Sequence, residues 1–350
     1  MTDVAVTLLV DSLCSMRGRA LWCVDEATSL QDLFQLTPTD DLVAVSNRVD
    51  VTHLLQTQGF RVQCNDFVFS EWEDGYFDIV AFRVGKEKAQ VHHWLNAAAR
   101  LLRTGGQLIV TGFKGDGAKT YIDKAAQMLG GSVQKLRGQR GVLGAVIRQK
   151  DDATPAVLLD DKAYGELRLV DDDATLTFWS KPGVFGWQKV DQGSQLLVSV
   201  LNEEVAAGLL KPSRVIDLGC GYGYLCIQAN RLFKAQFIAT DNNCASIRAC
   251  AANFRHYNID GEVILADCAC GINTSVDLLL CNPPFHQGFS VDSDLTGQFL
   301  RAAHRLLAKD GCALFVVNSF IALERRANSW FTRIETRVNN GRFKVVALRK

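Results

Sequence analysis

The sequence lacks an excess of either charge: its 350 residues include 38 Lys and Arg and 38 Asp and Glu. This balance excludes a generic polycation that holds nucleic acid by bulk charge alone, because such binding grows with the number of cations that neutralise phosphates. The charges are unevenly spread, with 19 basic and 14 acidic residues from Lys181 to the end. We therefore expect an anionic partner to meet the second half first, through a local basic surface.

The eleven cysteines lack the spacing of a metal site or a redox motif. No two of them form Cys-x-x-Cys, and no His pair lies near Cys268 and Cys270 at zinc spacing. No apolar run approaches the roughly 18 residues of a membrane span, and Met1 to Val6 do not begin a signal peptide. We therefore expect free thiols, no metal, no membrane attachment and a reducing, cytoplasmic setting.

What the sequence does have is an alternation of strand-like and helix-like segments, which is typical of α/β proteins. Val276–Cys281 is almost continuously apolar, as a central parallel strand should be. In the second half the pattern predicts strands at 214–217, 236–240, 262–266, 276–281, 313–317 and 343–348, and helices at 224–232, 245–254 and 295–307.

The front half repeats this layout in a weaker form. Phe77-Asp-Ile-Val80 parallels Val276-Asp-Leu-Leu279, and each is followed by an Ala-rich helix ending in Leu-Leu, a Gly turn and an apolar strand. The repetition predicts two tandem Rossmann-like domains with mostly parallel sheets that arose by duplication. We place the first domain at residues 1–150, a linker at 151–164 and the second domain at 165–350.

The clearest motif runs from Asp217 through Gly219 and Gly221 to Gly223, directly after a predicted strand and at the start of a predicted helix. Glycines let the backbone turn sharply and approach a ligand closely. A dinucleotide site is one interpretation, but the leading acid would sit badly beside a pyrophosphate. The motif better suits a cofactor that carries an ammonium and no phosphate, such as S-adenosylmethionine.

Two further acids, Asp241 and Asp267, close the second and third strands of this half. Taken alone, such residues are more often strand-end or cap residues. Their position is informative, because strand ends of an α/β sheet line the ligand crevice. Asp241 lies where an acid binds ribose hydroxyls, and Asp267 lies where a carboxylate reaches an adenine amine.

The second motif is Asn282-Pro283-Pro284-Phe285, at the end of the fourth strand. Two prolines end a central strand and fix the backbone rigidly. The side-chain carbonyl of Asn282 and the peptide oxygen of Pro283 form two neighbouring acceptors, which together can hold an –NH2 group. Phe285 can stack on a planar base. A Pro-rich loop with a buried aromatic is the competing interpretation, which the neighbouring glycine motif disfavours.

Together these motifs resemble the S-adenosylmethionine-dependent methyltransferases that modify amino groups. Three more segments, Lys181-Pro-Gly-Val-Phe185, Asp191-Gln-Gly-Ser-Gln-Leu-Leu197 and Gly341-Arg-Phe-Lys-Val345, are similar to bacterial ribosomal RNA guanine-N2 methyltransferases of the small-subunit (RsmC) type. The motifs that carry this resemblance lie in residues 177–348, and over 1–150 only the layout is similar.

The resemblance implies the function and the site. The cofactor would be S-adenosylmethionine, the substrate 16S ribosomal RNA in the 30S subunit, and the protein a monomer. It implies that the first domain is a degenerate copy without a cofactor site, serving folding or RNA placement. The implied cofactor-binding residues are Asp217, Gly219, Gly221, Gly223, Asp241 and Asp267, and the implied catalytic residues are Asn282, Pro283, Pro284 and Phe285.

Several alternatives stay open at the level of sequence. The large-subunit (RlmG) type shares the continuation Phe285-His286-Gln287, and Asn-Pro-Pro also serves adenine-N6 and protein-glutamine methylation. A ribosome-assembly factor that no longer methylates is an alternative from another class. RNA contact is also a hypothesis for two basic sets, one near the C-terminus and one in the front half: Arg325, Arg326, Arg333, Arg337, Arg342 and Lys344, and Lys114, Lys119, Arg137 and Arg140.

Overall fold

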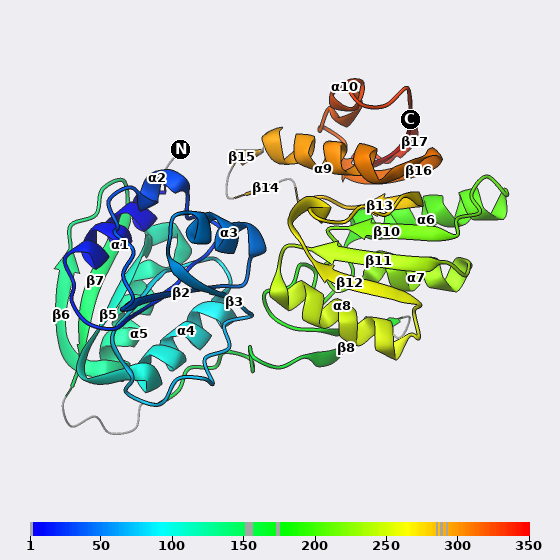
Figure 1. Ribbon diagram of the computed structural model, residues 1–350. Helices are drawn as coiled ribbons and strands as arrows, with labels where there is room; N and C mark the ends of the chain where they lie inside the picture. The colour runs from blue at the N-terminus through cyan, green and yellow to red at the C-terminus, as the bar shows by residue number, and fades with distance from the viewer. Residues whose placement is uncertain (1–2, 151–156, 173–175, 285, 288–289, 292) are drawn as a thin grey trace. The chain divides into compact units, whose positions relative to one another are not determined.

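The computed structural model describes residues 3–150, 157–172, 176–284, 286–287, 290–291 and 293–350 (Figure 1). The chain divides into two compact units, Met1–Glu166 and Leu167–Lys350. This boundary differs from the linker predicted at 151–164, because residues 157–166 pack on unit 1. Leu159 exchanges two hydrogen bonds with the side chain of Asn96, and Tyr164 is fully buried there. Because the segment is acidic in composition, the sequence did not indicate that Leu159 and Tyr164 attach it to unit 1.

Unit 1 is a seven-stranded sheet with helices on both faces. Its strand order is β3-β2-β1-β4-β5-β7-β6, parallel from β3 to β5 and antiparallel beyond. The elements are α1 Val4–Cys14, β1 Ala20–Cys23, α2 Leu30–Leu33, β2 Leu42–Ser46, α3 Val49–Thr57, β3 Arg61–Cys64, β4 Phe77–Arg83, α4 Lys88–Leu101, β5 Leu102–Phe113, η1 Lys114–Asp116, α5 Ala118–Leu129, β6 Gly130–Leu136 and β7 Val142–Gln149.

Unit 2 has the same topology, with strand order β12-β11-β10-β13-β16-β18-β17. A two-stranded sheet, β8-β9, precedes it in the chain. The elements are β8 Arg168–Asp172, β9 Leu176–Ser180, α6 Gln192–Ala206, β10 Arg214–Leu218, α7 Tyr224–Leu232, β11 Gln236–Asp241, α8 Cys244–His256, β12 Gly261–Leu265, η2 Asp267–Ala269, β13 Val276–Cys281, β14 His286–Gln287, β15 Ser290–Val291, α9 Ser293–Leu306, β16 Leu307–Asn318, α10 Leu323–Ala327, β17 Arg333–Asn339 and β18 Phe343–Arg349.

The core of unit 2 lies in two layers, one on each face of the sheet. Alternate residues of a strand point to opposite faces, so Leu278 and Leu280 of β13 pack with α6, α7 and α8. Leu279 and Cys281 pack with α9 and α10 on the other face. The central strand is therefore buried on both sides, as its continuous apolar pattern predicted.

The two units match residue by residue at the strand ends. Ala20 pairs with Ile79 in unit 1 as Val215 pairs with Leu278 in unit 2, and a carboxylate from the fourth strand accepts the same backbone N–H in each. Asp78 accepts from the N–H of Arg19 at 2.8 Å, and Asp277 accepts from that of Arg214 at 2.9 Å. Such matching beyond generic α/β periodicity supports the predicted duplication.

The strand register also identifies the residues of unit 1 that occupy the positions of the predicted site residues of unit 2. Trp22 stands at the position of Asp217, Ser46 at that of Asp241 and Arg83 at that of Asn282. Of the acids and the amide, only Asp66 is retained, at the position of Asp267. Both are followed by a non-glycine residue with positive φ, Phe67 at 52° and Cys268 at 43°. The first copy has thus kept the backbone of the region and changed most of its side chains.

Candidate active site

The glycine motif forms the turn between β10 and α7. All three glycines have left-handed φ values, 81° at Gly219, 55° at Gly221 and 88° at Gly223, a region that residues with a Cβ rarely adopt. A Cβ at Gly221 would meet no atom within 4 Å, whereas one at Gly223 would lie 2.8 Å from Sγ of Cys250. The turn is therefore open on the outer side at Gly221 and closely packed where α7 begins.

Asp217 lies beneath this turn and is fully buried. Its Oδ2 accepts a hydrogen bond from the thiol of Cys226 at 3.6 Å, and its Oδ1 has no partner among the described residues. Burial raises the pKa of Asp217 to about 7, against a smaller lowering by the Cys226 hydrogen bond. A buried carboxylate oxygen without a partner is costly, and a cationic group of a ligand that reaches it would remove that cost.

Asp241 is tied to the same turn. At the end of β11, its Oδ2 accepts from the backbone N–H of Gly221 and its Oδ1 from that of Asn243, both at 2.9 Å. Asp267 begins η2 and is half-buried at the rim of a cavity beside α9. The carboxyl-terminal ends of the neighbouring strands β10, β11 and β12 therefore bring the three predicted acids to one edge of the sheet.

Asn282 follows β13, the strand on the other side of β10. Its Nδ2 donates to Oδ2 of Asp191 at 2.9 Å and to Oγ of Ser194 at 2.8 Å. A carboxylate can only accept hydrogen bonds, so this pairing fixes which end of the amide is nitrogen. Both amide hydrogens are used on this side, and the carbonyl Oδ1 is the group that the side chain presents elsewhere.

The predicted aromatic platform cannot be placed with the rest of the motif. Pro283 is buried and Pro284 is exposed, while Phe285 lies outside the described residues. The thiol of Cys281 donates to the carbonyl of Leu218 at 3.1 Å, which holds the end of β13 against the start of the glycine turn. The two motifs predicted from the sequence therefore lie on adjacent strand ends.

Sequence reasoning missed the residues that hold the site in place. Asp191 and Ser194 lie in one of the segments that carried the family resemblance. The sequence offered only an N-cap pattern at Asp191, and nothing in it predicted the hydrogen bonds to Asn282. Asn253 is fully buried, and its Nδ2 donates to the carbonyls of Trp179 and Tyr222 at 2.9 and 2.7 Å. Tyr222, inside the glycine turn, also stacks on Phe178 with ring centres 4.2 Å apart.

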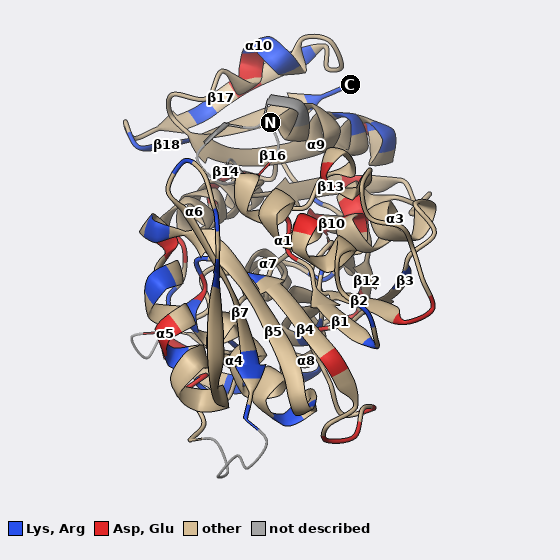
Figure 2. Cartoon of the chain, turned by 90° about the vertical axis from the view of Figure 1, so that its left-hand side faces the viewer, with Lys and Arg blue, Asp and Glu red and all other residues tan. Residues whose placement is uncertain are grey.

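The described part of the chain contains no group of three or more His, Cys, Asp or Glu that could hold a metal ion. All eleven cysteines are free thiols, and burial raises the pKa of Cys226 and Cys281 in the core. None of the helices in the described ranges combines the length and apolar character of a membrane span. The basic residues predicted for RNA contact are partly paired, since Lys344 bonds Glu324 and Arg337 bonds Glu204. In Figure 2, α10 carries acidic as well as basic residues.

Comparison with known proteins finds a family model that matches the second unit. Residues 175–347 match the family described as the methyltransferase small domain. Unit 2 is therefore similar to the methyltransferase small domain over almost its whole length. The match spans the β10–α7 turn, Asn282 and the antiparallel end of the sheet, so it covers the whole of the site described above.

Curated relatives extend the likeness into unit 1. Ribosomal RNA small subunit methyltransferase C of Yersinia enterocolitica is 28% identical over 269 residues, which cover 77% of this chain and 73% of that protein. Its namesake from Pseudoalteromonas translucida is 27% identical over 273 residues, with 77% and 76% covered. The resemblance predicted from the motifs is therefore confirmed.

A solved structure covers nearly the whole chain. The T. thermophilus 16S rRNA N2 methyltransferase RsmC, in complex with AdoMet and guanosine, aligns with a TM-score of 0.82 at 24% identity, over 99% of this chain and 92% of that one. At this identity the likeness shows the fold alone, and it confirms the predicted pair of Rossmann-like methyltransferase domains with mostly parallel sheets.

Proposed function

We propose that this protein transfers a methyl group from S-adenosylmethionine to the exocyclic N2 of a guanine in 16S ribosomal RNA. The observation that carries the proposal is the amide of Asn282, whose nitrogen end is fixed by Asp191 and Ser194, beside a glycine turn with a buried acid. The relatives' names and the methyltransferase domain support the same chemistry. The protein would act on the 30S subunit in the cytoplasm, as a monomer and without a metal.

Three features of the site fit S-adenosylmethionine. Oδ1 of Asp217 lacks a partner among the described residues and suits the ammonium of the cofactor. Space outside Gly221 lets the ligand approach the backbone. Asp241 would accept ribose hydroxyls and Asp267 would bind the adenine amine, with Gly219 and Gly223 shaping the turn. The bound cofactor supplies an electrophilic methyl group on a sulfonium.

The other motif would orient the nucleophile. Oδ1 of Asn282 and the carbonyl of Pro283 accept the two hydrogens of the guanine amine and direct the nitrogen lone pair toward the methyl group. A base amine conjugated with its ring is a poor nucleophile, and these bonds favour a more tetrahedral nitrogen. Rate then comes mainly from proximity and alignment. Pro284 stiffens the loop, and Phe285 would stack on the base after it leaves the RNA helix.

For unit 1 we propose a role without cofactor. Trp22, Ser46 and Arg83 replace two cofactor acids and the catalytic amide. The guanidinium of Arg83 is held by the carboxylates of Asp3 at 2.9 Å and Asp25 at 3.3 Å. An ion-paired arginine in place of an amide cannot accept hydrogen bonds from a target amine. The unit would support folding or place the RNA.

The test of the proposal is substrate competition with labelled S-adenosylmethionine. Unmodified 30S subunits, 50S subunits, DNA and release factor are offered together, and the labelled product is identified. Label in N2-methylguanine of 16S RNA supports the proposal. Label in 23S RNA, in N6-methyladenine or in a protein glutamine replaces it with the corresponding alternative. Cofactor that does not bind at all supports a non-catalytic assembly factor.

A further inference from the structure

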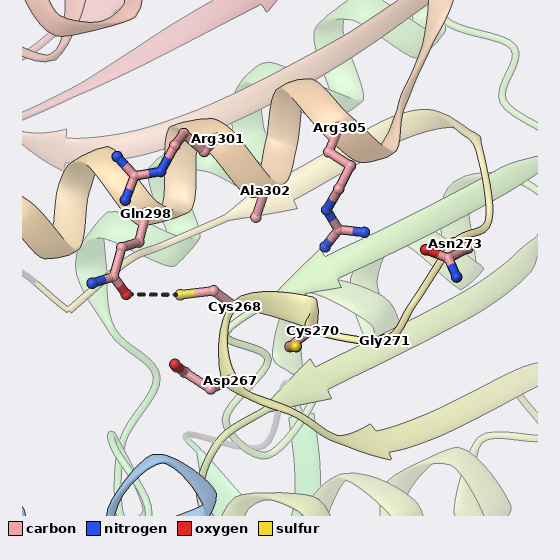
Figure 3. Close-up of a pocket in the computed structure, with 9 residues that line it drawn as sticks. All are labelled: Asp267, Cys268, Cys270, Gly271, Asn273, Gln298, Arg301, Ala302 and Arg305. Atoms are coloured by element: carbon pink, nitrogen blue, oxygen red, sulfur yellow. Dashed lines mark hydrogen bonds between the residues drawn. The ribbon is translucent and has the colours of Figure 1, made fainter. Parts of the chain in front are cut away.

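A cavity of about 480 Å³ opens on the surface of unit 2 between α9 and the loop that contains η2 (Figure 3). This volume is within the range of small-ligand sites. In Figure 3, Gln298 and Arg305 reach from α9 toward the loop, and Oε1 of Gln298 accepts from the thiol of Cys268. The cavity is lined by Asp267, Cys268, Cys270, Gly271, Asn273, Gln298, Arg301, Ala302 and Arg305.

Because the two units share one topology, the region of the cavity in unit 2 can be compared with the corresponding region of unit 1. Helices α4 and α9 each have 14 residues and run directly into strands of 12 residues, β5 and β16. Arg100 therefore corresponds to Arg305. Arg100 donates to the carbonyls of Phe69 and Trp72, and Arg305 donates to those of Ala269 and Ile272. The same arginine holds the same two points of the loop in both units.

In unit 1 this place is filled by flat rings. His93 corresponds to Gln298, and its ring lies between Phe69, with ring centres 5.7 Å apart, and Tyr164, 4.9 Å apart. Tyr164 is fully buried, and Leu159 binds the side chain of Asn96, the counterpart of Arg301. The aromatic loop residues and the segment 157–166 therefore cover this part of α4, where His93 is half-buried.

In unit 2 the loop has Ala269 and Ile272 in place of the two aromatic residues, and the groove is open. The amides of Gln298 and Asn273 offer donors and acceptors at its wall. Arg301 is exposed at its mouth, and the lining holds two guanidinium groups against one carboxylate. A space that corresponds to one occupied by flat rings in unit 1, with amides beside it and two guanidinium groups in its lining, matches a nucleotide.

We infer that this cavity binds a single nucleotide of the RNA substrate, beside the proposed cofactor site. The base enters beside Gln298, and its phosphate meets Arg301. Asp267 lines the cavity and also belongs to the proposed cofactor site, so the cavity borders that site. The inference rests on the proposed function, because it takes RNA as the substrate.

Two substitutions test the site from different sides. Arg301→Glu reverses the charge at the mouth, and Cys270→Trp fills the cavity from an exposed loop position. Arg255→Glu, an exposed arginine in the last turn of α8, is the matched charge control. Filter binding of a 16S RNA transcript should weaken on the order of tenfold for both test variants and stay near wild type for the control. Calorimetry should give unchanged affinity for S-adenosylmethionine.

The other outcomes overturn the inference in distinguishable ways. An equal loss of affinity for S-adenosylmethionine in both variants would make the cavity part of the cofactor site. Unchanged RNA binding with reduced methylation of whole 30S subunits would assign it to a ribosomal protein, and no change in either would leave it without a ligand. Because RNA binding is read without methyl transfer, a wild-type protein that methylates no guanine overturns the proposed function and not this site.

Discussion

The side-chain nitrogen of Asn282 lies 2.9 Å from Oδ2 of Asp191, a residue 91 positions earlier in the chain. The same carboxylate oxygen accepts from the backbone N–H of Ser194 at 2.9 Å and so caps the start of α6. One acid thus fixes both the helix and the orientation of the amide. Loss of the Asp191 carboxylate should therefore lower turnover through Asn282 and lower stability through α6, and the two effects can be measured separately.

The substitution Asp191→Asn should lower kcat about tenfold with little change in the KM for S-adenosylmethionine. An amide at 191 can donate as well as accept, so it no longer dictates which end of the Asn282 amide is nitrogen. Asp191→Ala also removes the helix cap and should cost a further ~1 kcal/mol of stability. A purely structural role predicts that kcat of Asp191→Asn equals wild type once the folded fraction is matched.

Asn282→Ala should reduce turnover on the order of 100-fold or more, because the amine loses an acceptor that aligns it with the methyl group. Affinity for S-adenosylmethionine, measured by calorimetry, should stay within about threefold, since Asp217 and Asp241 are unchanged. Equal losses in turnover and cofactor affinity would contradict the role assigned to Asn282. Ser194→Ala removes one of the two acceptors that hold the side-chain amide of Asn282. It should therefore reduce turnover less than Asn282→Ala does.

Cofactor binding should strengthen as pH rises through about 7. Burial raises the pKa of Asp217 to about 7, and the cationic cofactor favours the ionised carboxylate. Binding therefore releases protons in this range, which calorimetry in buffers of different ionisation enthalpy measures. In the free protein, the same raised pKa makes the free energy of unfolding fall as pH rises from the ordinary carboxyl range to about 7. Asp217→Asn should bind weakly and without this pH dependence.

Gly223→Ala should destabilise unit 2 more than Gly221→Ala does. Both glycines have positive φ, which costs an L-residue about 1 kcal/mol. Only at 223 does the new Cβ also meet another atom, Sγ of Cys250 at 2.8 Å, and overpacking adds roughly 1–3 kcal/mol. Gly221→Ala should keep more stability and still lose cofactor affinity, since its Cβ enters the ligand side. Urea unfolding and calorimetry separate the two effects.

Arg83→Met should destabilise unit 1 by roughly 3–5 kcal/mol, because it leaves buried carboxylates without a counter-charge. Asp3, Asp25 and Asp116 all lie within 3.8 Å of its guanidinium. Burial already raises the pKa of Asp25, so the loss should shrink as pH falls and that carboxyl takes a proton. Arg103→Ala, which removes an exposed ion pair with Asp78, should cost less than about 1 kcal/mol. Equal losses for both variants would contradict this account.

The sequence predicted the elements whose signal is local. Tyr224–Leu232 forms a helix with the predicted bounds, and Val276–Cys281 forms the predicted central strand. The topology of unit 1 could be predicted from the duplication, because the weaker pattern of the front half repeats the layout of the second half. Strand ends adjacent in a parallel sheet bring their residues together, which is why Asp217, Asp241 and Asn282 lie near one edge.

What the sequence did not reveal depends on contacts between distant segments. The segment 157–166 is acidic in composition, yet Leu159 and Tyr164 anchor it on α4 of unit 1. The hydrogen bonds of Asn253 to Trp179 and Tyr222 join three segments that no local pattern connects. The open groove beside Gln298 became visible only when its filled counterpart in unit 1 was compared with it.

The central claim is that the amide held by Asp191 orients a guanine amine of 16S RNA. The most direct measurement is transfer of labelled methyl from S-adenosylmethionine to unmodified 30S subunits by the wild type and Asn282→Ala, with nuclease digestion to identify the labelled nucleoside. We predict label in N2-methylguanine for the wild type and almost none for Asn282→Ala, with cofactor binding intact in both. Label in another nucleoside, or equal transfer by the two proteins, would contradict the account.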